Sequence, residues 1–279
     1  MKFVAHEVAP PLSQWIESIF HYQDFQPDHS IERVVPTGHT FMLIELDGFE
    51  RSTFDNRSLQ VRAKFRQAWF SGPQQNFLSI SAHMNSEMFV VQFKPYGAYM
   101  FLKQRLDEFA ERVVPGQEIL NGAVIELRDK LLAAESSADK FHIAESWLAS
   151  RYDASRAPAP ELLEFIERLH AEPVAKLNQL MGAYGGSQKH LIDQFKRYVG
   201  LTPKRYQRIV RFNELLATMQ SEQQVNWSDV AHRCGYADQS HFIREFKKFS
   251  GFNPQAFIRD GHGEDGLNFF PIDRPSVDR

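Results

Sequence analysis

The sequence contains a single cysteine, Cys234, among its 279 residues. One cysteine excludes an internal disulfide and a cysteine-rich zinc site, and it favours a reducing compartment. The N-terminus lacks a basic region followed by a long apolar run, so we expect no signal peptide. No stretch approaches the roughly 18 apolar residues of a membrane span. These absences predict a cytoplasmic protein that has no membrane partner.

Catalytic and cofactor motifs are also missing. There is no glycine-rich phosphate loop and no G-x-S-x-G nucleophile motif. Cys234 is expected to be a small buried residue rather than a nucleophile. The histidines of the first half lack the close pairing that metal sites usually need: His6, His21, His29, His39 and His83. We therefore predict that the protein is not an enzyme and that it holds no metal and no cofactor.

The charge is unevenly distributed along the chain. The net charge is −3, but residues 161–260 contain 14 Lys and Arg against 11 Asp and Glu, a net of +3. The first 160 residues contain 16 basic against 20 acidic residues, a net of −4. Residues 187–211 hold seven basic residues and only Asp193 as an acid. A local basic region of this kind is a clue to nucleic-acid binding that the total charge hides.

The pattern of apolar residues predicts an α+β protein of two domains. Short apolar runs that end at turn residues predict strands at 41–46, 68–70, 77–81 and 88–93. Apolar spacing of three and four residues predicts helices at 99–109, 123–134 and 138–150. Together they predict a β-barrel or sandwich with accessory helices over residues 1–153.

A short linker is predicted to divide the two domains. Residues 154–160 lie in a stretch of small residues and prolines, and the helical period then continues from 161 to 260. The tail, 261–279, is rich in glycine and proline, so we expect an irregular extension that packs Phe269 and Phe270 onto a surface.

The helical half contains an internal repeat. Residues 187–206 align with 238–257 at an offset of 51, with seven identical pairs, among them Phe195/Phe246, Gly200/Gly251 and Pro203/Pro254. Each copy predicts a helix, a glycine-containing turn and a second helix. Apolar residues mark the first helices: Leu177, Leu180 and Met181 in one copy, Trp227, Val230 and Ala231 in the other.

The turn and end residues of the two copies also correspond. Gly185 and Gly235 suit turns that need a positive φ angle. Ser187 and Asp238 are good N-caps for the second helices, which Gly200 and Gly251 would end. A long helix over 203–219 then joins the copies.

A helix-turn-helix places its second helix in the major groove of DNA. Two copies joined by one helix can reach two successive groove segments, whereas a helical repeat can also simply pack on itself. Matching basic residues favour DNA, because they would lie where phosphates run: Lys196, Arg197, Lys247 and Lys248. A merely solvated face is the alternative for these four.

The second copy, GYADQSHFIREFKKFSGFNPQAF, resembles the second helix-turn-helix of the AraC/XylS family of bacterial transcription regulators. The family pattern is G-[FY]-x-[DS]-x-S-x-F-x-R-x-F-K-x-x-x-G-x-x-P, and the first copy resembles the family's first unit. The resemblance covers residues 161–260 and implies recognition helices near 187–198 and 238–249. By position it implies six base contacts: Lys189, Ile192, Asp193, Ser240, His241 and Arg244.

Several of these residues have another reading. Arg244 can contact guanine in bidentate fashion, or form a surface salt bridge with Glu245 or Asp238. Ile192 aligns with Ile243, so a core position is as consistent as a contact with a thymine methyl group. Asp193 could accept from cytosine but would repel phosphates. His190 and His241 share one repeat position, where a capping role competes with DNA contact.

The N-terminal half resembles the cupin-like sensor domains that precede many such regulators, through FSGPQQNF (70–77) and residues 90–120. The resemblance implies a small-molecule effector, with helices that often support a homodimer. It also implies double-stranded DNA as a partner, and RNA polymerase if the protein activates. Trp69 and the phenylalanines are expected in the core, or around an effector pocket.

Two other functions compete with this reading. One is a cupin-type enzyme whose helical half binds a partner protein, which would need convergent catalytic residues. The other is a DNA-repair fusion, which would need several reactive cysteines.

Overall fold

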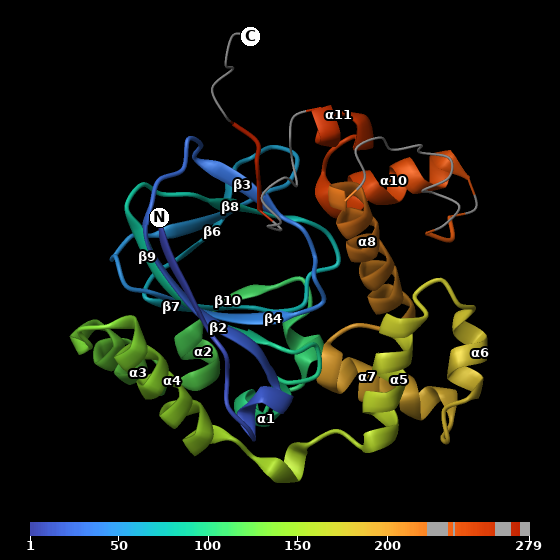
Figure 1. Cartoon of the computed structure of the whole chain (residues 1–279), viewed down its shortest axis with the longest axis horizontal. Helices are drawn as coiled ribbons and strands as arrows, with labels where there is room; N and C mark the ends of the chain where they lie inside the picture. Colours follow the sequence, from blue (N-terminus) through green and yellow to red (C-terminus); the bar gives the residue numbers. More distant parts are fainter. Residues whose placement is uncertain (222–233, 237, 260–268, 274–279) are drawn as a thin grey trace.

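The computed structural model describes residues 1–221, 234–236, 238–259 and 269–273. The chain forms a sheet-rich half followed by a helical half, and the two lie against each other (Figure 1). Ten strands lie within the first 115 residues, and helices of up to 19 residues begin at Pro160 and beyond. The α+β fold class predicted from the sequence is confirmed.

Two antiparallel sheets face each other in the first half. One has the order β1-β2-β9-β4-β7-β10 and the other β11-β3-β8-β5-β6. No strand pairing joins the sheets within the described residues, so the predicted barrel is an open, cupin-like jelly roll. The strands are β1 (Lys2–His6), β2 (Ile16–Phe25), β3 (Ile31–Val34), β4 (Thr40–Glu45), β5 (Arg51–Phe54), β6 (Val61–Phe65), β7 (Ala68–Ser71), β8 (Leu78–Ser81), β9 (Ser86–Phe93), β10 (Val113–Pro115) and β11 (Phe269–Pro271).

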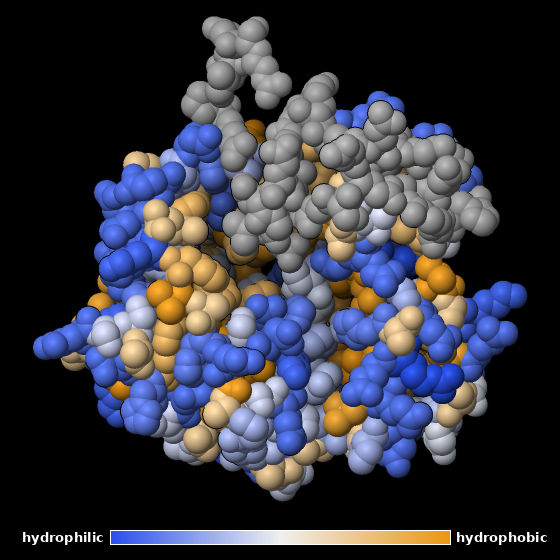
Figure 2. All heavy atoms as spheres, viewed as in Figure 1, coloured by the Kyte–Doolittle hydropathy of each residue, from blue (hydrophilic) through white to orange (hydrophobic). Residues whose placement is uncertain are grey.

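The four strands predicted from apolar runs correspond to β4, β7, β8 and β9. The strands that the pattern missed include β1 and β6, whose residues are mostly exposed. An exposed edge strand needs no apolar run, because neither of its faces is fully covered. Hydrophobic residues also gather over the sheets on the face drawn in Figure 2, on the left of the view.

Side chains from both sheets meet in the space between them. Trp69 of β7 lies 5.9 Å from Phe65 of β6, measured between ring centroids. Its indole Nε1 donates to the buried Glu45 carboxylate at 2.7 Å, and Arg51 Nε donates to the same group at 2.8 Å. Burial raises the pKa of Glu45, and the Arg51 charge opposes that effect.

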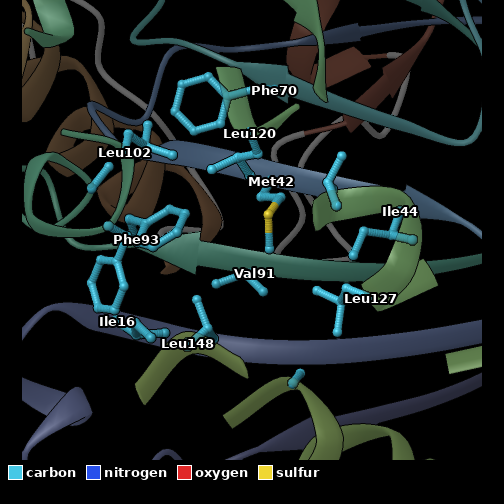
Figure 3. Close-up of a cluster of buried hydrophobic side chains, with 14 of the residues drawn as sticks. Ile16, Met42, Ile44, Phe70, Val91, Phe93, Leu102, Leu120, Leu127 and Leu148 are labelled. Carbon is cyan, nitrogen blue, oxygen red and sulfur yellow. The ribbon is translucent and has the colours of Figure 1, made fainter. Parts of the chain in front are cut away.

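Helices cover the opposite face of the six-stranded sheet and close the first core. The helices are α1 (Tyr99–Leu102), α2 (Gly116–Leu120), α3 (Ala123–Ala133) and α4 (Ser137–Arg151), with short 3-10 helices η1 (Leu12–Gln14) and η2 (Leu106–Phe109). Figure 3 shows how side chains of strands and helices interdigitate there, among them Met42, Val91, Phe93, Leu127 and Leu148.

One predicted helix is broken. The segment 99–109 was expected to be continuous, but α1 ends at Leu102 and η2 begins at Leu106. Lys103 adopts φ +59°, in the left-handed region that interrupts a helix. After this break, η2 packs against the helical half, where the carbonyl of Leu106 lies beside Gly200.

The helical half has its own core, separate from the first. Its helices are α5 (Pro160–Ala171), α6 (Leu177–Gly182), α7 (Gln188–Val199), α8 (Pro203–Ser221), α10 (Gln239–Ser250) and α11 (Pro254–Arg259). The short 3-10 helix η3 (Ala154–Arg156) lies in the predicted linker. In the described part of the chain, no helix combines the length and apolar character needed to span a bilayer.

The described part of the tail is not irregular, which corrects the prediction for that segment. Strand β11 pairs antiparallel with β3, with Phe270 opposite Arg33. The Asp273 carboxylate accepts from the backbone N–H of Ser30 at 3.1 Å and of Ile31 at 2.9 Å. Phe270 is buried against Phe257 of α11, 4.8 Å between ring centroids. The expected packing of Phe270 is confirmed, whereas Phe269 is exposed.

Candidate DNA-binding surface

The second helices of the two repeat copies, α7 and α10, begin and end in the same way. The Ser187 side chain accepts from the His190 backbone N–H, and the Asp238 side chain accepts from the His241 backbone N–H. Each satisfies one of the free N–H groups of a first turn, as an N-cap should. The described structure thus confirms the two predicted N-caps and the start of both helices.

Glycine ends both helices in the left-handed conformation. Gly200 follows α7 with φ +76°, and Gly251 follows α10 with φ +78°. The turn before α10 also uses this conformation, at Gly235 with φ +68°. Gly185 does not adopt a positive φ, so the prediction for that turn is wrong. The first helix of the second copy, with Trp227, Val230 and Ala231, lies outside the described residues.

Aromatic residues of α10 face the core and leave a polar stripe outside. Phe242, Phe246 and Phe249 are buried. The spacing of four, seven and eight residues then puts Ser240, Arg244, Lys247 and Lys248 on the outer side, and all four are exposed. His241 is partly exposed, 5.5 Å from Tyr236 between ring centroids. The predicted contact residues of the second copy therefore share one accessible face.

Arg244 does not form the salt bridge with Glu245 that the sequence left open. Glu245 is 3 % exposed and points inward. Its partners are Arg208 and Arg211 of α8, at 2.7 and 3.2 Å. Among the residues that the structure describes, Arg244 has no ion-pair partner, and its guanidinium is accessible.

The first copy presents its predicted contacts differently. Lys189 is exposed near the start of α7, whereas Ile192 is partly buried against the second core. Asp193 accepts from Arg105 of the sheet-rich half at 3.0 Å and lies 3.6 Å from Arg197. The hydrogen bond from Arg105 lowers the pKa of Asp193. Lys196 and Arg197 are partly exposed, so the first copy offers a less open face than the second.

Sequence reasoning missed the charge cluster in which the buried Glu245 pairs with the partly exposed Arg208 and Arg211. A clue was present in the register of α10. Glu245 lies three residues after Phe242 and four before Phe249, which places an acid within the apolar stripe. A buried acidic residue needs a charged or hydrogen-bonding partner, and the arginines of the joining helix supply it.

Contacts between the two halves hold the helical half against the sheets. The Asn213 side chain of α8 donates to the carbonyl of Pro36 at 2.9 Å. Tyr198 of α7 packs edge-on against Tyr99, 5.0 Å between ring centroids. Arg33 lies between the rings of Phe77 and Phe252, 4.7 Å from each centroid, and donates to the carbonyl of Gly251.

No group of three or more His, Cys, Asp or Glu residues suited to a metal ion occurs in the described ranges. Cys234, the only cysteine of the sequence, is buried. The candidate site is the pair of capped helices α7 and α10, which carry polar and basic residues outward.

Comparison with known proteins agrees with this class of site. Residues 180–260 match a family described as a helix-turn-helix domain, and residues 6–115 match a domain of unknown function, DUF6597. The uncharacterized HTH-type transcriptional regulator YbfI of Bacillus subtilis is 36% identical over 109 residues, which is 36% of this chain and 38% of that protein. The HTH-type transcriptional activator RhaS of Pectobacterium carotovorum is 24% identical over 172 residues, 57% of this chain and 56% of that protein.

The chain thus spans between about a third and a little over half of the curated relatives it matches. Among solved structures, ToxT from Vibrio cholerae aligns over 92% of this chain and 97% of its own, at 12% identity and a TM-score of 0.43. The C-terminal region is an AraC-type helix-turn-helix domain. The likeness to the AraC/XylS family of regulators is thus a likeness of that domain, residues 180–260.

Proposed function

We propose that the chain is a sequence-specific DNA-binding transcription regulator that reads two adjacent major-groove segments. The observation that carries this proposal is the exposed stripe of Ser240, Arg244, Lys247 and Lys248 on a capped recognition helix. Arginine favours guanine edges, and lysines beside it neutralise phosphates, so the stripe combines base and backbone contacts. No reaction is assigned to the chain, and its place of action is proposed to be the cytoplasm.

The stripe makes Arg244 and Lys247 respond differently to substitution. We expect Arg244→Ala to weaken binding to the cognate duplex by about 1–3 kcal/mol and to relax base choice at one position. Lys247→Ala should weaken binding to all duplexes. It should also reduce the steepness of the plot of log binding constant against log salt concentration by about one unit. Fluorescence anisotropy with a duplex selected from a random pool by the full chain, at several salt concentrations, measures both effects.

Lys130→Ala is the matched control, because Lys130 is exposed on α3 in the sheet-rich half. It removes the same charge without touching either recognition helix, so its affinity and salt slope should equal those of the unsubstituted chain. Wild-type affinity in both Arg244→Ala and Lys247→Ala would contradict the proposed docking of α10.

We further propose that the sheet-rich half binds a small-molecule effector between its two sheets. Aromatic side chains that pack on the cluster of Phe65 and Trp69 are only partly buried, among them Phe20, Tyr22 and Phe41, and the Glu45–Arg51 ion pair adds a polar group. A ligand with an apolar body and a polar group fits that lining. Adding bulk to this cluster by Leu43→Trp should abolish any change that a small-molecule panel produces in DNA affinity, while leaving basal DNA binding intact.

Two further partners are proposed for the same function: a second copy of the chain and RNA polymerase. A homodimer would let two chains occupy two half-sites, and sedimentation velocity of the full chain distinguishes it from a monomer. An activator would also contact RNA polymerase, which transcription in vitro from the selected duplex would reveal.

A further inference from the structure

Helix α8 is the common scaffold of the two helix-turn-helix copies. At its start, Tyr206 is fully buried and lies 5.5 Å from Phe195 of α7 between ring centroids. Further along, Phe212 packs on Phe246 and Phe249 of α10, at 5.6 and 4.9 Å. Because both recognition helices pack on one rigid helix, their separation depends on how each is fixed to α8.

The aromatic contacts to α10 do not fix its rotation by themselves. Ring faces pack favourably over a range of offsets and angles, so apolar packing alone allows a helix to turn or slide. Hydrogen bonds between ions are more restrictive in distance and angle, and a bidentate guanidinium adds geometric specificity. The ion pairs between α8 and α10 are therefore the contacts that set the orientation.

Glu245 forms these ion pairs from inside the helix interface. One carboxylate oxygen accepts from Arg208 Nε at 2.8 Å and lies 2.7 Å from Arg208 Nη2. The other oxygen accepts from Arg211 Nη2 at 3.2 Å. His241, one turn earlier on α10, places its Nε2 3.8 Å from the first oxygen.

The two arginines also contact the turn that precedes α10. The Arg211 guanidinium lies 4.5 Å from the centroid of the Tyr236 ring, and its Nη1 donates to the carbonyl of Gly235 at 3.3 Å. Arg208 lies 5.6 Å from the centroid of the Phe249 ring. One arginine pair thus holds the turn, the start and the end of the second recognition helix.

We infer that Glu245 is a positioning residue that, with Arg208 and Arg211, sets the angle of α10 on α8 and hence the spacing of half-sites that the chain accepts. It contacts no base itself, because its carboxylate is turned into the protein. This inference rests on the proposed function for its DNA consequence, whereas the orientation of α10 can be measured without DNA.

The DNA experiment compares Glu245→Gln with the unsubstituted full chain. The probe is a duplex selected from a random pool by the full chain, together with versions that carry one or two extra base pairs between the half-sites. We expect the unsubstituted chain to lose affinity sharply with each insertion. Glu245→Gln should bind the original spacing about 10-fold more weakly, because charged hydrogen bonds are lost, and respond little to insertion.

Arg244→Ala is the matched control on the same helix. It should lower affinity at every spacing while keeping the sharp dependence on insertion, since Arg244 lies on the exposed side of α10. If Glu245→Gln unfolds, Arg208→Lys provides the same test, because it keeps the charge and loses the Nε hydrogen bond to Glu245. A sharp spacing dependence that survives in the folded variant overturns the inference.

The second experiment measures orientation directly. Spin labels at Lys189→Cys on α7 and Lys248→Cys on α10, in a chain that also carries Cys234→Ala, report the distance between the recognition helices. We expect a shifted or broader distance distribution in Glu245→Gln. An unchanged distribution overturns the inference even if DNA binding stands, whereas a chain that selects no duplex but shows the shift overturns only the proposed function.

Discussion

At the scale of single residues, two acids beside the recognition helices have opposite environments. Glu245 is buried between α8 and α10, where removing it would leave two arginines without their shared partner. Asp193 is half exposed and pairs with Arg105 across the boundary between the halves. A buried paired charge stabilises one geometry, whereas an exposed pair is weak enough to open.

We expect the free energy of unfolding to depend on pH through His39, which lies where the sheet-rich half meets the helical half. Burial lowers the pKa of His39 to about 4, and the nearby His170 adds to the effect. The unfolded chain takes up this proton near pH 6.5, so the folded state is favoured above that pH and loses stability as pH falls toward 4. We expect a loss of about 1–2 kcal/mol between pH 7 and pH 5.

Urea unfolding of the full chain at pH 7 and pH 5 measures this loss. His39→Gln should remove most of it, since glutamine does not titrate. His142→Gln is the control, because His142 is exposed on α4. An equal pH slope in His39→Gln and in the unsubstituted chain would show that other groups carry the dependence.

At the scale of elements, the C-terminal end of α7 both terminates that helix and contacts the sheet-rich half. Gly200 ends α7 in the left-handed conformation and also touches the sheet-rich half. A Cβ atom added there would lie 2.5 Å from Pro73 Cγ and 2.7 Å from the carbonyl oxygen of Leu106. The end of the first recognition helix therefore depends on glycine both for its backbone angle and for the close approach of η2.

Replacing Gly200 by alanine should test these two causes together. The left-handed angle alone costs about 1–2 kcal/mol for a residue with a Cβ atom. Gly48→Ala isolates that cost, because Gly48 has φ +81° and nothing within 4 Å of the added atom. We expect Gly200→Ala to lower the free energy of unfolding by at least about 1 kcal/mol more than Gly48→Ala does.

Calorimetry or urea unfolding of the two variants gives this comparison. Equal losses would mean that η2 moves aside at little cost, and that the contact between Gly200 and Leu106 does not hold the halves together.

At the scale of the whole molecule, the helical half is fixed to the sheets at several places. Strand β11 extends the five-stranded sheet from the far end of the chain, and Arg33 joins that sheet to the end of α10. Arg105 joins η2 to α7 through Asp193. The second recognition helix keeps an open face in this arrangement, whereas the first carries an ion pair to the other half.

Breaking that ion pair should release the first recognition helix. We expect Arg105→Gln to raise affinity for the selected duplex by up to about fivefold at low salt, since an exposed pair is worth up to about 1 kcal/mol. A gain in affinity would distinguish release of the helix from a simple charge effect, because the loss of a positive charge by itself weakens DNA binding. Anisotropy titrations at low and high salt measure the effect, which should shrink as salt screens the pair.

Arg66→Gln is the matched control. Arg66 pairs with Glu50 on the surface of the sheet-rich half, so its loss changes the net charge equally and leaves α7 unchanged. If Arg105→Gln weakens DNA binding as much as Arg66→Gln does, the ion pair between Arg105 and Asp193 does not restrain α7.

The sequence alone determined the elements with a strong local pattern. The apolar stripes of α7, α8 and α10, the caps at Ser187 and Asp238 and the stops at Gly200 and Gly251 follow from spacing and backbone chemistry within a few residues. The duplication was readable for the same reason, since both copies satisfy the same local rules. The exposed stripe of α10 followed once its apolar face was known.

Only the tertiary structure decided which residues pair over long distances in the chain. Nothing local to Asp193 indicated that it would meet Arg105, 88 residues earlier, and nothing in the tail indicated that β11 would pair with β3. Edge strands such as β1 escaped detection because exposure leaves no apolar period to read. Glu245 combines both cases: its register marked it as an inward-facing acid, but the arginines that hold it were fixed only when α8 and α10 packed together.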